Sequence, residues 1–326
     1  MEENRTKVVI DCDPGTDDCF ALMLCIKHLD VKGIVTVGGN TGLEYTEKNA
    51  RFMTELCGRT DIPVYAGYDQ PMFGKAVRAA YAHGATGLGD VIIPEPKKQL
   101  EPVHGVDFLI DFFMHNDDVK LITLGPLTNV AQAILKEPRL CKRIPEILCM
   151  GGSGTAGNFS AAAEFNIYVD PEAAKIVFES GIPIRMVGLN LTRQNNMNMK
   201  DVEAMKAIGN PVADFAAAIL THNAGKGGVC SLCDACTVVW YIDPQIIRKS
   251  LMVHVDVETR GEFTRGMTLC DWRDYMGTDP ICDIAHEKKY DTTFAGKKEP
   301  NVEVAMEFDA DRFRKLLMDT LRSYGA

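Results

Sequence analysis

The stretch VVIDCDPGTDDCFALML, residues 8–24, joins an apolar run to a helical pattern and carries four aspartates within the positions 11–18. They are Asp11, Asp13, Asp17 and Asp18. Alternate residues of a strand share a face, so the first two aspartates point one way and Cys12 points the other way, into the core. Pro14-Gly15 turns the chain, and the last two aspartates begin a helix, whose dipole favours acidic residues there. We therefore predict that all four carboxylates lie near the carboxyl end of one strand, where open α/β sheets bind ligands.

Such a concentration of like charge is costly unless something compensates for it. Two carboxylates 4 Å apart repel each other by roughly 4 kcal/mol at an effective dielectric near 20. A helix N-cap and a solvated turn account for one or two of these aspartates, but not for four. The group must be solvated, partly protonated or neutralised by a cation, and a donor set made only of oxygen favours Ca²⁺ or Mg²⁺ over zinc. The stretch therefore predicts a metal site.

Short apolar runs alternate with amphipathic segments along the chain, and this alternation predicts the fold class. The apolar runs predict strands at 7–13, 33–38, 62–66, 119–124, 144–150 and 182–188. The segments between them predict helices at 17–29, 45–57, 106–115, 127–135 and 171–179. Further on, we expect helices at 211–221, 234–242 and 309–323 and a β-like stretch at 251–258. Strand and helix in repetition predict parallel strands with helices on both faces. Without a linker or repeat, 1–326 is expected to be a single large α/β domain with a mostly parallel open sheet.

Composition and charge exclude several function classes. The 326 residues carry a formal net charge of −10, whereas a surface that binds nucleic acid or anionic lipid needs a basic patch. No stretch approaches the roughly 20 apolar residues of a membrane span. MEENRTK, at the N-terminus, leads directly into a strand, so we see no signal peptide and expect a cytoplasmic protein. The eleven cysteines are then expected to be free thiols.

Polar residues follow several of the other predicted strands. Asn40 follows VTVGG, LGPLTN (124–129) ends one strand, and MGG (150–152) ends another. The segment GNFSAAAEFNIYVDPEAA (157–174) adds Asn158, Glu164 and Asn166. Each of these signals is weak alone, because Asn and Gly are ordinary loop residues. Together they predict a ring of polar groups around a dication, suited to a polyhydroxylated, sugar-like ligand.

Six motifs, in this order, resemble those of the nucleoside hydrolases of the inosine–uridine-preferring family, which cleave the N-glycosidic bond of ribonucleosides. They are DCDPGTDD (11–18), VGGN (37–40), GPLTN (125–129), MGG (150–152), AEFNIYVDPEAA (163–174) and CDACTVVWYIDP (233–244). The resemblance runs from about residue 7 to about residue 320. It implies the nucleoside hydrolase fold and the hydrolysis of purine or pyrimidine ribonucleosides, or both, to ribose and free base. It also implies a role in nucleoside salvage and assembly as a homodimer or homotetramer.

The resemblance also assigns roles to single positions. It implies Ca²⁺ as the cofactor, with the ligands Asp13, Asp18, Asp234 and the main-chain carbonyl of Leu124. Asp13 is also implied as the base that activates water. The implied contacts of the ribose 2′- and 3′-hydroxyls are Asp17, Asn166 and Asp234, and those of the 5′-hydroxyl are Glu164 and Asn158. Asn40 and Met150 are implied to line the ribose pocket, and His83 to lie near the base.

One position departs from much of the family. Where many members have a histidine that helps to protonate the leaving base, this chain has Cys233, as one branch of the family does. The substitution leaves base preference and leaving-group activation open. His222, in LTHNAGKGG, is a candidate for reaching the base from a glycine-rich flap, and the simpler alternative is an exposed loop histidine.

Two other functions and one other metal site remain as alternatives. A DxD-type phosphatase uses an aspartate to attack phosphorus, but it also needs a downstream lysine and an acidic pair that we cannot place. A non-catalytic ribose-binding module would bind ribose without turnover. Cys230, Cys233 and Cys236 form a CxxCxxC pattern, but with three thiolates and no fourth cysteine nearby we do not expect a zinc or iron–sulfur cluster.

Overall fold

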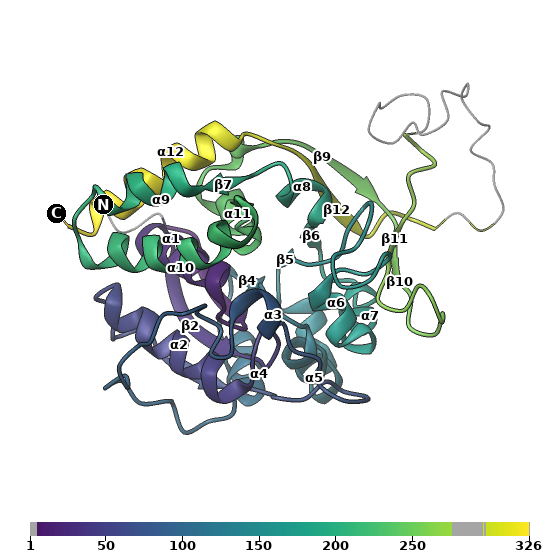
Figure 1. Ribbon diagram of the computed structural model, residues 1–326. Coiled ribbons are helices and arrows are strands. Elements are labelled where there is room, and N and C mark those ends of the chain that lie inside the picture. Colours follow the sequence, from purple (N-terminus) through teal and green to yellow (C-terminus); the bar gives the residue numbers. More distant parts are fainter. Residues whose placement is uncertain (1–4, 276–295, 297, 326) are drawn as a thin grey trace.

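A mostly parallel eight-stranded sheet forms the centre of the molecule in the computed structural model, which describes residues 5–275, 296 and 298–325 (Figure 1). The order of the strands is β3-β2-β1-β4-β5-β6-β12-β9. Their bounds are β1 Lys7–Cys12, β2 Asp30–Thr36, β3 Val64–Ala66, β4 Val119–Thr123, β5 Ile147–Met150, β6 Ile184–Val187, β12 Val302–Phe308 and β9 Ile247–Val253. Only the edge strand β9 is antiparallel to its neighbour β12; the other pairs are parallel. The predicted fold class is confirmed.

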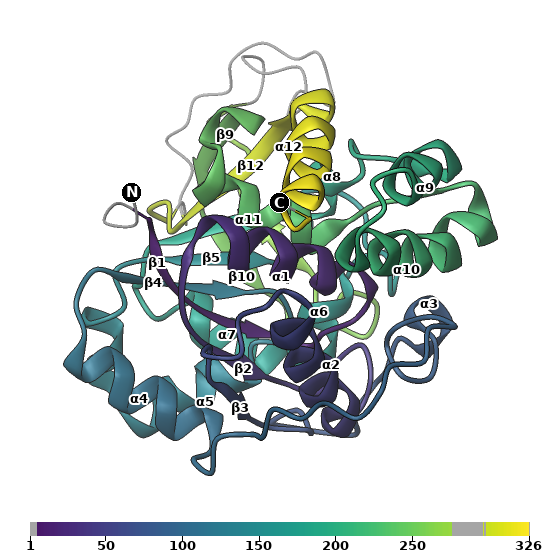
Figure 2. The same ribbon diagram turned by 90° about the vertical axis from the view of Figure 1, so that its left-hand side faces the viewer.

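Helices cover both faces of this sheet, because successive strand residues point to opposite sides. Val8 and Ile10 of β1 pack into one core, whereas Val9 packs into the other. The first core holds α1 (Thr16–His28), α2 (Leu43–Leu56), α10 (Pro211–Gly227), α11 (Cys233–Ile242) and α12 (Ala310–Ser323). The second core holds α4 (Gly105–His115), α5 (Thr128–Lys136) and α7 (Pro171–Phe178). Figure 2 shows α4 and α5 on the side of the sheet away from α12.

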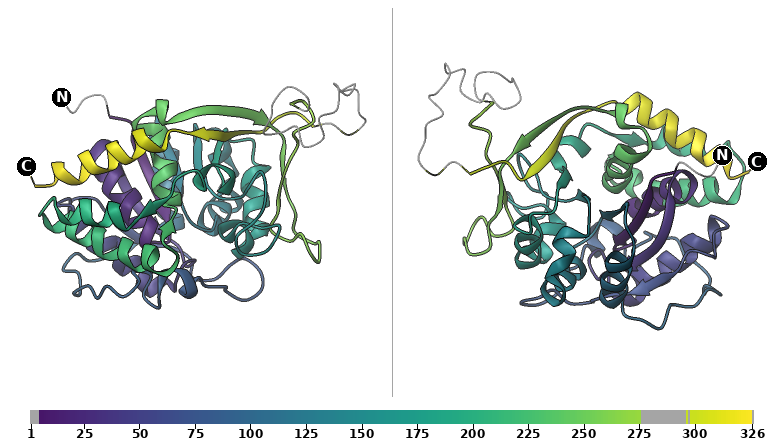
Figure 3. Two further views of the ribbon diagram at one scale, coloured as in Figure 1. Left: turned by 45° about the horizontal axis from the view of Figure 1, so that its top comes forward. Right: turned by 180° about the vertical axis from the view of Figure 1, so that it is seen from behind.

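Short elements connect this framework and extend its edges. They are α3 (Ala80–His83), η1 (Pro138–Lys142), α6 (Phe165–Val169), α8 (Leu189–Thr192), β7 (Met197–Asn198), α9 (Met199–Lys206), β8 (Val229–Cys230), η2 (Pro244–Ile246), β10 (Val255–Val257) and β11 (Thr268–Cys270). Strands β7 and β8 pair antiparallel, as do β10 and β11. The β10–β11 pair lies at the opposite end of the molecule from α9 and α10 (Figure 3). The predicted β-like stretch 251–258 is divided between β9 and β10.

One predicted boundary is wrong, and it changes the place of a candidate residue. We expected the helix that starts at Pro211 to end at residue 221, before the glycine-rich segment. Helix α10 continues to Gly227 and ends at Gly228, which has a φ of 78° and caps the helix in the left-handed conformation. A glycine inside a helix costs only about 1 kcal/mol relative to alanine, and neighbouring residues can offset that cost. His222 therefore lies in a helix and not in a flap or an exposed loop.

The prediction of free thiols agrees with the described part of the chain. The ten cysteines there are free, and Cys282 lies outside the described residues. None of the helices that the structure describes is long and apolar enough to cross a membrane.

Candidate active site

A cavity of about 360 Å³ opens at the carboxyl ends of the central strands. Its wall includes most of the site residues predicted from the sequence: Asp17, Asn40, His83, Leu124, Met150, Asn158, Glu164, Asn166, Cys233 and Asp234. These residues come from segments that are far apart in the sequence, and those that end or follow β1, β2, β4 and β5 meet because parallel strands end at one edge of the sheet. Asp13 and Asp18 are fully buried and hydrogen-bonded to Asn40, which is part of the cavity wall, whereas His222 is not part of that wall.

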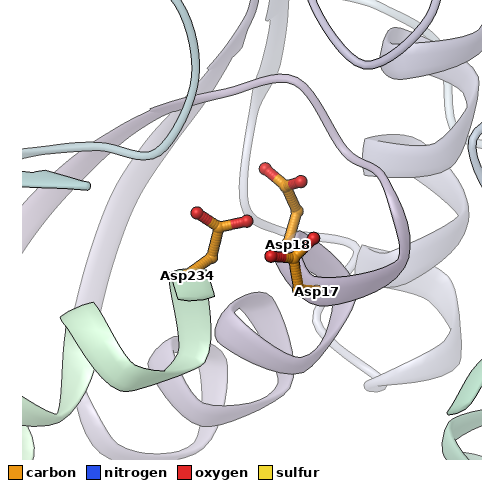
Figure 4. Close-up of side chains that lie close together, drawn as sticks. All are labelled: Asp17, Asp18 and Asp234. Carbon is orange, nitrogen blue, oxygen red and sulfur yellow. The ribbon is translucent and has the colours of Figure 1, made fainter. Parts of the chain in front are cut away.

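Three carboxylates converge beside the cavity. Asp17 and Asp18 belong to the first turn of α1, and Asp234 belongs to the first turn of α11 (Figure 4). Each offers an oxygen, and these oxygens lie within 4.8 Å of one another. Each aspartate also lies at a helix N-terminus, where the helix dipole favours negative charge. Two segments more than 200 residues apart in sequence thus build one acidic site.

Asp13 follows β1 and is enclosed by main chain. The Asn40 backbone N–H donates to Asp13 Oδ2 over 2.6 Å, and the Asn40 side-chain amide donates to the Asp13 carbonyl over 3.2 Å and to Asp18 Oδ2 over 3.1 Å. Gly39 and Gly125 approach the Asp13 carboxylate so closely that a Cβ at either position would collide with it. Two loops, one after β2 and one after β4, therefore hold this carboxylate in place.

The electrostatics of the carboxylates fit a cation. Burial is the largest cause that raises the pKa of Asp13, Asp18 and Asp234, and neighbouring carboxylates raise it further; for Asp18 the pKa reaches about 7. One oxygen each of Asp13 and Asp18 is buried without a hydrogen-bond partner. Buried charges of this kind are normally paired or coordinate a metal. Oxygen donors, orphaned atoms and mutual repulsion together make this a fitting site for a hard divalent cation.

Asp11 does not join this group, contrary to our expectation for all four aspartates of the opening stretch. It is fully buried, and its Oδ2 accepts a hydrogen bond of 2.9 Å from the side-chain amide of Asn129, in α5. Burial raises its pKa to about 7. The same Asn129 side chain donates to the Thr36 carbonyl and accepts from the Tyr68 backbone N–H, so it ties together the ends of β1 and β2 and the loop after β3.

A second group of polar residues lies across the cavity, at and after β5. The Asn166 side-chain amide donates to the Leu124 carbonyl over 2.8 Å and to the Met150 carbonyl over 3.3 Å. Glu164 caps α6 and accepts from the backbone N–H groups of Gly152, Asn166 and Ile167. The Asn158 side chain accepts from the Phe165 backbone N–H over 2.9 Å. These bonds fix the polar residues that the sequence predicted.

Residues of α3 and of α10 form another part of the cavity wall. His83, in α3, has its Nδ1 3.0 Å from the Thr16 hydroxyl and 3.8 Å from Asp17 Oδ1. Tyr81 and Asn223 are cavity residues that our sequence reasoning missed. Their positions in the sequence could have indicated them, because Tyr81 stands two residues before His83 and Asn223 directly follows His222.

His222 lies next to Asp90, in the segment after α3. Its Nδ1 lies 2.8 Å from Asp90 Oδ2, and its side chain is only 6% exposed. This contact joins α10 to the segment that follows α3. His222 precedes Asn223, which lines the cavity, but is not itself part of the cavity wall.

The three cysteines of the CxxCxxC pattern have three different environments. Cys233 lines the cavity, and its thiol donates to the Thr192 hydroxyl over 3.4 Å. Cys230 also lines the cavity, whereas Cys236 is fully buried and accepts from the Asn195 amide. Among the described residues, the only group of three or more acidic, histidine or cysteine side chains that could hold a metal is the aspartate trio. A thiolate metal cluster finds no support in this part of the chain.

The fold and the site define a mostly parallel α/β protein with an acidic cavity at the carboxyl edge of its sheet. The model of the inosine-uridine preferring nucleoside hydrolase family matches residues 8–315, and the chain belongs to this family. It is 42% identical to a pyrimidine-specific ribonucleoside hydrolase RihA of Photobacterium profundum over 284 residues, which are 84% of this chain and 91% of the relative. The RihA of Shigella boydii is 37% identical over 97% of this chain and 98% of its own.

Two solved structures support the same assignment. A plant nucleoside hydrolase, PpNRh1, superimposes with a TM-score of 0.86 at 30% identity and covers 98% of this chain and 100% of its own. A purine-preferring ribonucleoside hydrolase from Gardnerella vaginalis superimposes with a TM-score of 0.84 at 28% identity, with 98% of each chain covered.

Proposed function

We propose that this enzyme is a Ca²⁺-dependent ribonucleoside hydrolase that acts in nucleoside salvage and releases ribose and a free purine or pyrimidine base. The observation that carries the proposal is the position of buried, orphaned carboxylate oxygens beside a cavity lined with polar groups. The names of the relatives, which include pyrimidine-specific and purine-preferring enzymes, support ribonucleosides as the substrate class. Neither the phosphatase nor the non-catalytic binding module accounts for the family match.

The residues proposed to hold Ca²⁺ are Asp13, Asp18, Asp234 and the Leu124 carbonyl. A bound dication supplies Lewis acidity toward the ribose hydroxyls and lowers the pKa of water. The convergence of Asp18 with Asp234, and the orphaned oxygens of Asp13 and Asp18, support this donor set.

Asp13 is proposed as the general base. It removes a proton from the water that attacks the anomeric carbon, and its enclosure by main chain keeps its carboxylate in one orientation. The N-glycosidic bond between the ribose and the nucleobase breaks through a transition state with oxocarbenium character, as in other glycoside hydrolysis. The surrounding carboxylates stabilise the positive charge that develops on the ribosyl group.

The remaining polar residues are proposed to orient the ribose. Asp17, Asn166 and Asp234 hydrogen-bond to its 2′- and 3′-hydroxyls, and Glu164 and Asn158 to its 5′-hydroxyl. Asn40 and Met150 complete the ribose pocket. The support is that all of these residues line one cavity.

Departure of the base is proposed to depend on His83 more than on Cys233 or His222. His83 lines the cavity, whereas His222 is paired with Asp90 outside the cavity wall. The Cys233 thiol already donates to Thr192, and thiols are weak donors. We assign His83 to contact with the base, Cys233 to packing beside it and His222 to support of the wall.

The assembly and compartment are also proposals. We infer a homodimer or homotetramer that binds no nucleic acid or membrane, in a reducing cytoplasm. The ten free thiols support a reducing compartment, and the net charge of −10 is unfavourable for binding to polyanions.

The test is a panel of inosine, adenosine, guanosine, uridine and cytidine, assayed for free ribose before and after exhaustive chelation. We expect hydrolysis of at least one nucleoside, complete loss after chelation and recovery when Ca²⁺ is added. Full activity in protein that elemental analysis finds metal-free contradicts the metal dependence. Phosphate release from phosphate esters without ribose release selects the phosphatase, and saturable ribose binding without turnover selects the binding module.

A further inference from the structure

The Thr16 hydroxyl lies between the two segments that form the base-side wall. Thr16 is the first residue of α1 and is 1% exposed. Its Oγ1 accepts a hydrogen bond of 2.7 Å from the Asn223 side-chain amide, in α10. The same oxygen lies 3.0 Å from His83 Nδ1, in α3. One buried hydroxyl thus joins α3 and α10, both of which line the cavity.

The direction of these hydrogen bonds determines the tautomer of His83. The Thr16 backbone N–H, which can only donate, points at His83 Nδ1 over 3.3 Å. Nδ1 must therefore accept, and a neutral imidazole that accepts at Nδ1 carries its proton on Nε2. The Thr16 hydroxyl consequently donates to Nδ1, while its own oxygen accepts from Asn223. The side-chain hydrogen bonds therefore run in one direction, from Asn223 to Thr16 and from Thr16 to His83.

The charged group nearest to Nδ1 opposes this arrangement. Asp17 Oδ1 lies 3.8 Å from His83 Nδ1, so the carboxylate attracts a proton to that nitrogen. The two donors of Thr16 compete with Asp17 for the same nitrogen. Removal of the Thr16 hydroxyl takes away the shorter of the two bonds and shifts the balance toward a proton on Nδ1.

We propose that Thr16 is a positioning residue, whose hydroxyl holds His83 in the Nε2–H tautomer and ties α3 to α10, so that the cavity offers a ring N–H donor to the leaving base. This inference rests on the proposed hydrolysis of ribonucleosides. It concerns the base side of the cavity only. The expected recipients are acceptor atoms of the base, such as a pyrimidine carbonyl or a purine ring nitrogen.

The kinetic test compares two variants that differ in the hydroxyl. Thr16→Val keeps the shape and loses the hydroxyl, whereas Thr16→Ser keeps the hydroxyl. Loss of one hydrogen bond predicts that kcat of Thr16→Val falls about 3- to 10-fold, while Thr16→Ser stays within about 2-fold of the wild type. Binding of free ribose in the presence of Ca²⁺ is expected to be unchanged in both variants, because the ribose contacts lie elsewhere. Equal kcat values for the two variants, or a matching loss of ribose affinity in Thr16→Val, overturn the proposal.

A second measurement does not depend on activity. Nitrogen-15 NMR of histidine-labelled protein distinguishes the two tautomers, and His83 is assigned by the signal that His83→Gln removes. We expect wild-type His83 to carry its proton on Nε2 and Thr16→Val to shift toward Nδ1–H. A proton on Nδ1 in the wild type overturns the proposal, even if the enzyme hydrolyses nucleosides as expected. If Thr16→Val does not fold, Asn223→Ala, which removes the bond that orients the hydroxyl, is expected to shift the His83 signal in the same direction. An unchanged signal in Asn223→Ala then overturns the proposal.

Discussion

The two sides of the cavity are held in different ways. On the carboxylate side, Asp13 and Asp18 are fully buried and bonded to backbone N–H groups of strand-end loops. On the base side, α3 has only four residues, and Tyr81 is 64% exposed. The bonds that hold α3 and the segment after it include side-chain contacts from His83 to Thr16 and from Asp90 to His222.

This difference indicates how the two sides divide the work. A carboxylate fixed by main chain keeps its position whatever side chains surround it, so it suits a reaction centre whose geometry must not vary. A wall held partly by side-chain contacts can differ among enzymes that bind the same sugar but prefer different nucleobases. The ribose side is expected to carry the largest catalytic effects, and the base side smaller effects that depend on the substrate.

The largest effect is expected for Asp13→Asn. Loss of a general base typically costs about 100- to 10,000-fold in rate, and the change also removes a proposed metal ligand. Steady-state kinetics should show the loss in kcat, with binding of a ribose analogue weakened less. If the variant keeps more than a tenth of the wild-type kcat, another residue must be the general base. The carboxylate side would then not carry the largest catalytic effect.

A smaller effect is expected for Asp17→Ala, on the same side. Asp17 is proposed to bind a ribose hydroxyl, and a hydrogen bond to a charged group contributes about 1.5–3 kcal/mol, or about 10- to 150-fold. The loss should be divided between KM and kcat, because the bond forms in both the ground state and the transition state. If KM stays at the wild-type value, Asp17 does not bind the substrate, and fewer residues bind the ribose than proposed.

The smallest effect is expected for Cys233→Ala, beside the base. Burial, followed by the Asp17 carboxylate, raises the pKa of this thiol well above its usual value, so it stays neutral. Its hydrogen already bonds to Thr192, and we expect kcat to fall about 3-fold or less, within the range of one weak hydrogen bond. The rate should show no thiol-like titration. A loss as large as that of Asp13→Asn, on both inosine and uridine, would make the thiol essential and reverse the ranking of the two sides.

The central sheet was predictable because its signals are local. The six strands predicted between residues 7 and 188 correspond to β1–β6. They could be predicted because apolar runs bounded by turn residues are typical of buried parallel strands. Strand β12 was not predicted, although residues 302–308 alternate in burial almost as a strand does. It pairs with β6 although more than 100 residues separate the two strands in sequence, and no local signal specifies that pairing.

The candidate site was predictable to the extent that it lies at strand ends. The carboxylates after β1 and the polar residues after β4 and β5 could be placed from sequence, because parallel strands end at one edge. Asp234 and His83 required the family resemblance, since nothing in their local sequence links them to β1. The pairing of His222 with Asp90, and the sharing of Thr16 by His83 and Asn223, depend on how α3 and α10 pack, which periodicity does not encode.

The enclosure of Asp13 by Gly39 and Gly125 limits how this enzyme can be changed. Because both neighbours approach through the main chain, no side-chain substitution at either position can retune the basicity of the carboxylate without displacing it. With Asp13 as the proposed general base, engineering for a new nucleobase is expected to succeed in α3 and α10 and to fail at Gly39 and Gly125. The same enclosure keeps the orientation of the Asp13 carboxylate independent of the side chains of α3 and α10.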